Sequence, residues 1–240
     1  MSPLPEHVAA IAHADETAAA TARYLEALTT LGAADVRAPS ALPGWSRGHV
    51  ISHVARNADG LRNLFIWART GVETPQYASS EQRNLDIDSG ARRSLPELIE
   101  DFRVSADRFL DEASRLHPEA WDFPVRTLSS PKLFPARDVF KSRRIEVEVH
   151  HADLGVAYTA HHWPEDFTDL VIGRVQDDRA DGPSMVLSST DTPGLWKFGR
   201  GQGPEISGSK ADLAWWLIGR GDGSALVSSA GVIPELGRWR

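Results

Sequence analysis

The chain has 240 residues, a formal net charge of −7 and no cysteine, and 41% of its residues are hydrophobic. This length allows one large domain or two modest ones with real cores, and the composition is that of a soluble protein. The negative charge, with no basic stripe to offset it, argues against broad binding to nucleic acids or anionic membranes. Without cysteine, the protein has no disulfide and no thiolate of its own for catalysis or metal binding.

The sequence contains no targeting or membrane-spanning signal. The N-terminal residues lack a basic segment followed by an apolar core, so we expect no signal peptide. No run approaches the about 18 apolar residues that a membrane span needs. We therefore expect a cytoplasmic protein and, since no exposed apolar stripe argues for a dimer, a monomer.

Apolar spacing and capping residues predict four long helices in the N-terminal part of the chain. They are expected over residues 5–31, from Ser46 to about 70, from Ser94 to about 116, and from Pro135 to about 154. Residues 72–93 form a polar connection, and a loop of this length is usually functional. Four helices joined in part by long crossovers predict a four-helix bundle.

The character of the sequence changes after residues 158–164. Beyond this linker we expect two helices and three short strands, over residues 166–179, 185–189, 195–198, 205–207 and 209–221. We therefore predict an α+β protein of two domains. A four-helix bundle would occupy residues 1–160, and a small α/β domain would occupy residues 161–240.

Two pairs of candidate metal ligands lie on the fourth predicted helix. Glu146 and His150 are four residues apart, so they share one helix face at a Cβ separation of about 6 Å. Glu148 and His151 are three apart and point about 160° away. Only one pair can face the core, and the alternating apolar residues between them do not decide which.

The second predicted helix carries two further histidines, His49 and His53. His49 falls in the first turn, where a capping role explains it. His53 also has a structural explanation, as a buried histidine hydrogen-bonded to Asn57 one turn later. Two imidazoles and one carboxylate from two helices nevertheless suffice for a divalent ion with an open coordination position. We therefore predict a catalytic metal site.

The chain resembles the DinB-like metalloenzymes and, among them, the mycothiol-dependent maleylpyruvate isomerase family. The resemblance lies in residues 42–58 (LPGWSRGHVISHVARNA), 73–84 (ETPQYASSEQRN), 144–155 and 219–221. These segments belong to both predicted domains, and 73–84 is more specific than the general bundle motif. The resemblance implies a DinB-like bundle that carries the metal site, followed by the small C-terminal domain.

Family members bind zinc through a histidine of the second helix and a Glu-x-x-x-His pair of the fourth. The resemblance therefore implies three ligands in this chain: His53, Glu146 and His150. It leaves His49, Glu148 and His151 outside the ligand set. Two family arginines correspond to Arg83 in the long connection and Arg220 after the last helix. Both resemble anchors for substrate carboxylates, which a planar guanidinium can bind through two hydrogen bonds.

The resemblance implies zinc and mycothiol as cofactors and a dicarboxylate as substrate. Coordination to zinc would hold the mycothiol thiol as a thiolate, which suits a chain without cysteine. The thiolate would add to the cis double bond of maleylpyruvate, the resulting single bond would rotate, and elimination would give fumarylpyruvate. Breakdown of aromatic compounds through gentisate is the expected setting. Asp153 would either hydrogen-bond a ligand histidine or cap its helix.

Three other functions are compatible with the same fold. A mycothiol S-transferase would consume the thiol, because the adduct would be its product. A hydrolase that uses zinc-bound water would need no thiol. A zinc-binding interaction module would show no turnover. Whether mycothiol is consumed, needed in catalytic amount or not needed separates these possibilities.

Overall fold

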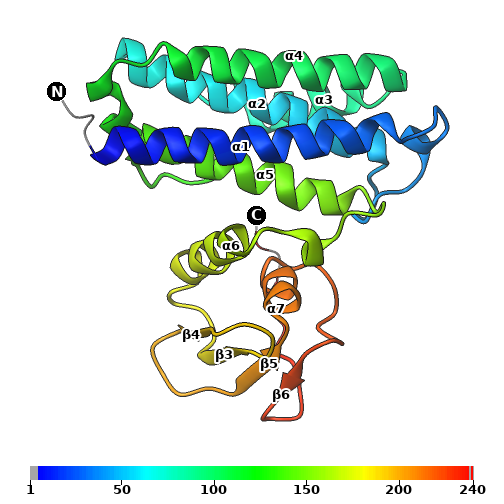
Figure 1. Cartoon of the computed structure of the whole chain (residues 1–240), viewed down its shortest axis with the longest axis vertical. Helices are drawn as coiled ribbons and strands as arrows, with labels where there is room; N and C mark the ends of the chain where they lie inside the picture. Colours follow the sequence, from blue (N-terminus) through cyan, green and yellow to red (C-terminus); the bar gives the residue numbers. More distant parts are fainter. Residues whose placement is uncertain (1–4, 238, 240) are drawn as a thin grey trace. The chain divides into compact units, whose positions relative to one another are not determined.

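The computed structural model describes residues 5–237 and 239. The chain divides into two compact units, Met1–Val156 and Ala157–Arg240. The first is a bundle of helices and the second a small sheet with helices (Figure 1), which confirms the predicted α+β class. None of the described helices is both long and apolar enough to cross a membrane.

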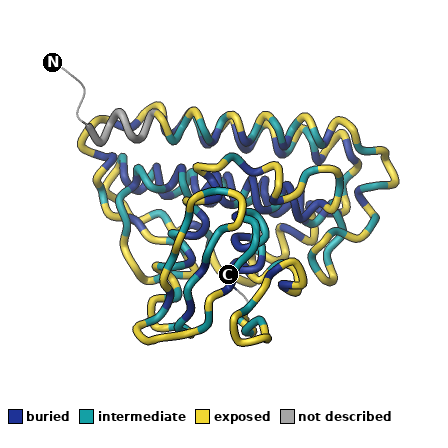
Figure 2. Tube along the Cα trace, turned by 60° about the horizontal axis from the view of Figure 1, so that its bottom comes forward, coloured by how far each residue is buried: buried dark blue, intermediate teal, exposed yellow. Residues whose placement is uncertain are grey.

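Four long helices form the first unit, as predicted. They are α1 (Pro5–Thr29), α2 (Arg47–Thr70), α4 (Leu95–Ser114) and α5 (Val139–Asp153). Helix α2 packs against both α4 and α5, and α1 packs against the same two helices. Figure 1 shows the four helices lying alongside one another. In Figure 2 the buried residues of this unit, drawn in dark blue, lie mostly on its helices.

Helix α2 begins at a reciprocal cap that involves a histidine. The Ser46 side chain accepts a hydrogen bond from the backbone N–H of His49, while the Ser46 N–H donates to Nδ1 of His49 at 3.2 Å. His49 thus does what glutamate or glutamine usually does at this position. The helix ends at Gly71, whose φ of 72° is left-handed and favours glycine.

The connection 72–93 contains a helix that the sequence did not predict. Helix α3 (Ser80–Gly90) begins after Ser79, whose Oγ accepts from the backbone N–H of Gln82 at 3.0 Å. Only Ile87 and Gly90 of α3 are buried. A helix that is polar on nearly every side has no apolar stripe, so periodicity could not reveal it.

Two glycines let α3 lie close to the N-terminal part of α2. A Cβ atom added to Gly48 would lie 2.8 Å from the carbonyl oxygen of Ala91. A Cβ atom added to Gly90 would lie 2.2 Å from Oγ of Ser52. Both distances are far below van der Waals contact, so only glycine permits this approach. The approach places the side chains of α3 beside those of α2.

The fourth long helix begins later than Pro135, where the sequence placed its first turn. Pro135 lies instead in the short strand β2 (Phe134–Pro135), which pairs antiparallel with β1 (Pro124–Val125). Its ψ of 144° is extended, and a 3-10 turn at Ala136–Asp138 precedes α5. Proline fixes φ near a value that both conformations share, so it could not distinguish them.

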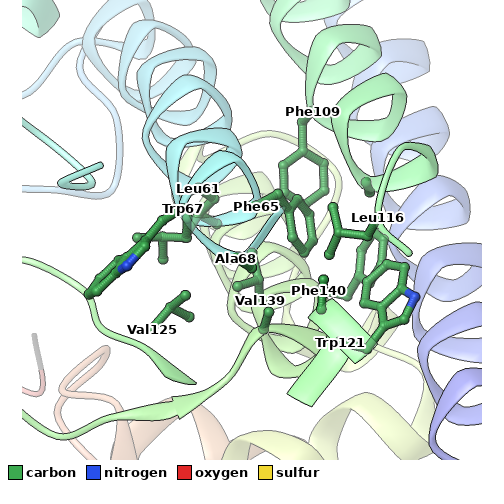
Figure 3. Close-up of a cluster of buried hydrophobic side chains, with 14 of the residues drawn as sticks. Leu61, Phe65, Trp67, Ala68, Phe109, Leu116, Trp121, Val125, Val139 and Phe140 are labelled. Atoms are coloured by element: carbon green, nitrogen blue, oxygen red, sulfur yellow. The ribbon is translucent and has the colours of Figure 1, made fainter. Parts of the chain in front are cut away.

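A cluster of aromatic rings fixes α2 against α4 and α5 (Figure 3). The ring centroid of Phe65 on α2 lies 5.1 Å from that of Phe109 on α4 and 5.3 Å from that of Phe140 on α5. All three side chains are buried, and burial of each stabilises the fold by about 1.5–3 kcal/mol. Because the cluster holds α2 and α5 together, it also sets which of their side chains meet.

The second unit is a four-stranded sheet with two helices. The strands are β3 (Met185–Ser189), β4 (Leu195–Phe198), β5 (Glu205–Gly208) and β6 (Val227–Ser228), and the helices are α6 (Glu165–Asp178) and α7 (Lys210–Leu217). The strand order is β4-β3-β5-β6, with β3 and β5 parallel and the other pairs antiparallel. Strand β6 was not predicted, since two residues are too few for a sequence pattern.

Candidate metal centre

Three predicted ligands meet where α2 faces α5. Nε2 of His53 lies 3.0 Å from Oε2 of Glu146 and 2.9 Å from Nε2 of His150, and the last two atoms are 3.5 Å apart. Zinc bonds of about 2.0–2.1 Å in tetrahedral geometry separate donor atoms by about 3.3 Å. The two imidazole nitrogens and one carboxylate oxygen therefore fit a single zinc ion. No other such group occurs among the described residues.

The other candidate pair on α5 faces a different helix. The buried carboxylate of Glu148 pairs with the guanidinium of Arg23 on α1. The His151 ring meets the ring of Tyr24, also on α1, edge-on at a centroid distance of 5.3 Å. Helix α5 thus presents Glu146 and His150 to α2 and the second pair to α1.

His150 is oriented by a buried carboxylate. Its Nδ1 donates to Oδ2 of Asp153 at 2.8 Å, and the Asp153 side chain is completely buried. This hydrogen bond keeps a proton on Nδ1, so Nε2, which faces the other two predicted ligands, is the nitrogen available to a metal ion. Of the two roles considered for Asp153, the contact with a candidate ligand histidine is the one observed.

We expect Asp153→Asn to weaken zinc binding by about 10–100-fold, the usual effect of removing a partner of a metal ligand. The amide cannot supply the same charged acceptor to His150, so the imidazole loses its orientation and basicity. Competition with a chromophoric chelator would measure the zinc affinity. Asp111→Asn, an exposed change on α4, is the matched control and should bind zinc as the wild type does. Equal affinities in both variants would show that Asp153 does not support a zinc ligand.

Arg83 lies beside the three predicted ligands, although it is on helix α3 and not in a loop as predicted. Its Nη2 lies 3.2 Å from Nδ1 of His53. The guanidinium also lies over the ring of Tyr77, at 5.7 Å from the centroid. Asn57, considered above as a structural partner of His53, instead accepts at Oδ1 from Nη1 of Arg143 at 2.9 Å.

Arg220 belongs to the second unit. It follows α7 in a turn flanked by Gly219 and Gly221, both with positive φ, and its backbone N–H donates to the carbonyl oxygen of Trp215 at 3.1 Å. Its Nη1 is 3.5 Å from the carbonyl oxygen of Ile218. A substrate-binding role for Arg220 stays a prediction from the family resemblance.

Burial and mutual contact shift the pKa values of the three predicted ligands in different directions. Burial opposes charge on Glu146, but contacts with His150 and His53 outweigh it and lower the pKa of Glu146 well below its usual range. Burial also opposes charge on His150, but hydrogen bonds to Asp153 and Glu146 raise its pKa to about 9. Burial and the charge of His150 lower the pKa of His53 to about 4. Zinc binding would therefore compete with protonation of His150.

Tyr77 is a candidate site residue that sequence reasoning did not single out. It is half-buried, its hydroxyl interacts with the side chains of Asn57 and Arg83, and burial raises the pKa of its phenol to about 12. It therefore stays protonated, close to the predicted ligands. A single tyrosine in a polar stretch forms no pattern that would mark it as a site residue. The sequence could have indicated Tyr77 only through its position in the segment 73–84, the most specific part of the resemblance.

Comparisons with known proteins agree with this geometry. A family model described as the mycothiol maleylpyruvate isomerase N-terminal domain matches residues 17–155, and the MDMPI C-terminal domain matches residues 162–238. The chain is 30% identical to a mycothiol-dependent maleylpyruvate isomerase of known crystal structure (TM-score 0.89) and 29% identical to a histidine-to-alanine variant of such an enzyme (TM-score 0.88). Each match covers 100% of both chains. No curated protein matches the sequence. The chain therefore belongs to the mycothiol maleylpyruvate isomerase family.

Proposed function

We propose that this protein is a zinc- and mycothiol-dependent enzyme that isomerises maleylpyruvate to fumarylpyruvate. The observation that carries the proposal is the convergence of His53, Glu146 and His150 with Arg83 beside them. Three protein ligands are the number that catalytic zinc sites use, because a fourth position must stay free for the reactant. Family membership and the similar isomerase structures support the same activity.

His53, Glu146 and His150 would hold the zinc ion, which when bound supplies a coordination position where the mycothiol thiol is kept as the thiolate nucleophile. Asp153 holds the His150 imidazole in the tautomer that leaves Nε2 free. The Arg83 guanidinium would bind one substrate carboxylate and hold the cis double bond beside the sulfur. Addition makes the central bond single, rotation follows, and elimination restores the double bond in the trans form, so mycothiol is regenerated.

The direct test is a product assay with purified, zinc-loaded protein and maleylpyruvate. We expect conversion to fumarylpyruvate only when mycothiol is present, and an amount of thiol far below that of the substrate should suffice. Mycothiol should be recovered unchanged. Loss of thiol into an adduct would instead identify a mycothiol S-transferase. Turnover without any thiol would identify chemistry by zinc-bound water, and no turnover with either would favour a binding module.

The cytoplasmic location, the monomeric state and the gentisate route remain parts of this proposal. They rest on the family resemblance and on the sequence, and the product assay does not depend on them. Sedimentation of the purified protein would measure the oligomeric state directly.

A further inference from the structure

A polar groove of about 430 Å³ opens beside the first turn of α2. Its lining comes from the 3-10 turn Asp35–Arg37, from the start of α2, and from the last turn of α3 and the residues just after it. The lining residues are Arg37, Ser46, His49, Asp88, Ala91 and Arg92. None of these side chains is a large apolar one, so the groove is suited to a polar ligand.

The walls of the groove are held rigidly. The guanidinium of Arg37 donates to the carbonyl oxygens of Ala91 and Arg92, and also to that of Arg93 at 3.2 Å. These bonds satisfy carbonyl groups at and just after the C-terminal end of α3. The close approach at Gly48 fixes the same end of α3 against α2. The backbone of the groove is therefore fixed before a ligand binds, which lowers the ordering cost of binding.

The groove lies one helical turn from His53, one of the three predicted metal ligands. His49 lines the groove, and His53 is a predicted ligand. The two residues are four apart on α2, so they share one helix face and are separated by one turn, a rise of about 5.4 Å. The half-buried indole of Trp45 is near both histidines, with centroid distances of 6.2 Å to His49 and 5.6 Å to His53. The Trp45 indole therefore lies beside both the groove residue His49 and the predicted ligand His53.

The chemistry of the lining matches a polyhydroxylated ligand. The exposed Asp88 carboxylate accepts hydrogen bonds, and the exposed Arg92 guanidinium donates them. Nε2 of His49 lies 3.8 Å from Oδ1 of Asp88, so one hydroxyl group could bridge the two. A hydroxyl is both donor and acceptor and satisfies such a mixed set without adding charge. The carboxylate of Asp88, in contrast, disfavours a dicarboxylate here.

We propose that this groove binds the glucosaminyl-inositol part of mycothiol while its cysteinyl arm reaches the metal centre. The inference rests on the proposed function, because it assumes mycothiol as the thiol. The arm is several bonds long, enough to cover one helical turn of about 5.4 Å. Helix α3 would then serve both reactants: Arg83 in its N-terminal half binds the substrate, and Asp88 in its last turn binds the thiol carrier.

Kinetics with a truncated thiol test the groove. N-acetylcysteine has the reactive arm of mycothiol and lacks the sugar and inositol. We expect Asp88→Asn and Arg92→Ala each to lower the ratio of kcat/KM for mycothiol to that for N-acetylcysteine by about tenfold, the loss of roughly one charged hydrogen bond. The matched controls are Asp111→Asn and Arg115→Ala, which break an exposed ion pair of 2.6 Å at the C-terminal end of α4 and should keep the wild-type ratio.

Binding of a sulfur-free probe gives a readout without turnover. Glucosaminyl-inositol should shift the backbone amide NMR signals of Ser46, His49 and Asp88 in wild-type protein, with or without zinc. Binding should weaken in the Asp88 and Arg92 variants and not in the two controls. Shifts confined to another surface, or an unchanged kinetic ratio in both groove variants, would overturn the groove assignment.

The two proposals can fail separately. Mycothiol-dependent isomerisation with an unchanged ratio in the groove variants would retain the proposed function and reject the groove. If the wild-type enzyme does not respond to mycothiol, the proposed function fails and the groove assignment, which assumes this thiol, fails with it. The presence or absence of mycothiol dependence in the wild type therefore tells which proposal is at fault.

Discussion

Replacing His150 with alanine is expected to abolish zinc retention and turnover together. His150 meets both other predicted ligands, with its Nε2 2.9 Å from Nε2 of His53 and 3.5 Å from Oε2 of Glu146. Alanine would leave two protein ligands, too few for a stable catalytic zinc site. The loss should exceed the about 10–100-fold expected for a change at Asp153, because a ligand itself is removed and not its partner.

The measurement is zinc content by elemental analysis after gel filtration, together with the product assay. His53→Ala should give the same result, since its imidazole comes from the other helix of the pair. His117→Ala is the matched control, because this histidine is exposed and pairs only with the exposed Glu119 among the described residues. Circular dichroism of each variant separates lost zinc from lost folding. Full zinc occupancy in both ligand variants would contradict the assignment of the metal site.

The face of α5 that meets α2 could not be read from the apolar pattern. Ile145, Val147 and Val149 are all buried, because α5 lies between α1 and α2 and is covered on more than one side. A helix buried in this way has no single apolar stripe, and its two polar pairs look alike in sequence. Which pair faces α2 depends on how the helices cross, which long-range packing such as the Phe65–Phe140 contact decides.

Capping residues, in contrast, predicted the boundaries of α2 well. Ser46 and Gly71 mark the start and end of α2 because their interactions are local and involve the backbone directly. Helix α3 escaped prediction although Ser79 caps its start, because a helix that is polar on nearly every side has no apolar stripe. Tyr77 escaped because its partner Asn57 is on another helix, so their contact depends on packing. A cap without an apolar stripe was thus not enough to predict a helix.

Arg83→Ala is expected to retain zinc and to lose at least about 100-fold in kcat/KM for maleylpyruvate. The guanidinium lies next to the predicted ligands without being one of them. Its Nη2 is 3.2 Å from Nδ1 of His53, whereas Nε2 of His53 is the ring nitrogen that contacts Glu146 and His150. A carboxylate bound by the planar fork makes two charged hydrogen bonds, each worth about 1.5–3 kcal/mol. Lysine cannot form the fork, so Arg83→Lys should restore only part of the activity.

The same contact with His53 suggests another role, in which Arg83 only positions a metal ligand, and the measurements separate the two. A positioning role predicts weaker zinc binding in Arg83→Ala and an equal loss of activity for every substrate. A substrate anchor predicts normal zinc content and a loss that shrinks when the carboxylate is removed from the substrate, as in a maleylpyruvate monoester. This comparison is a double-mutant cycle between the protein and its ligand. Arg103→Ala on the exposed face of α4 is the control, and wild-type kinetics in Arg83→Ala would exclude Arg83 from the mechanism.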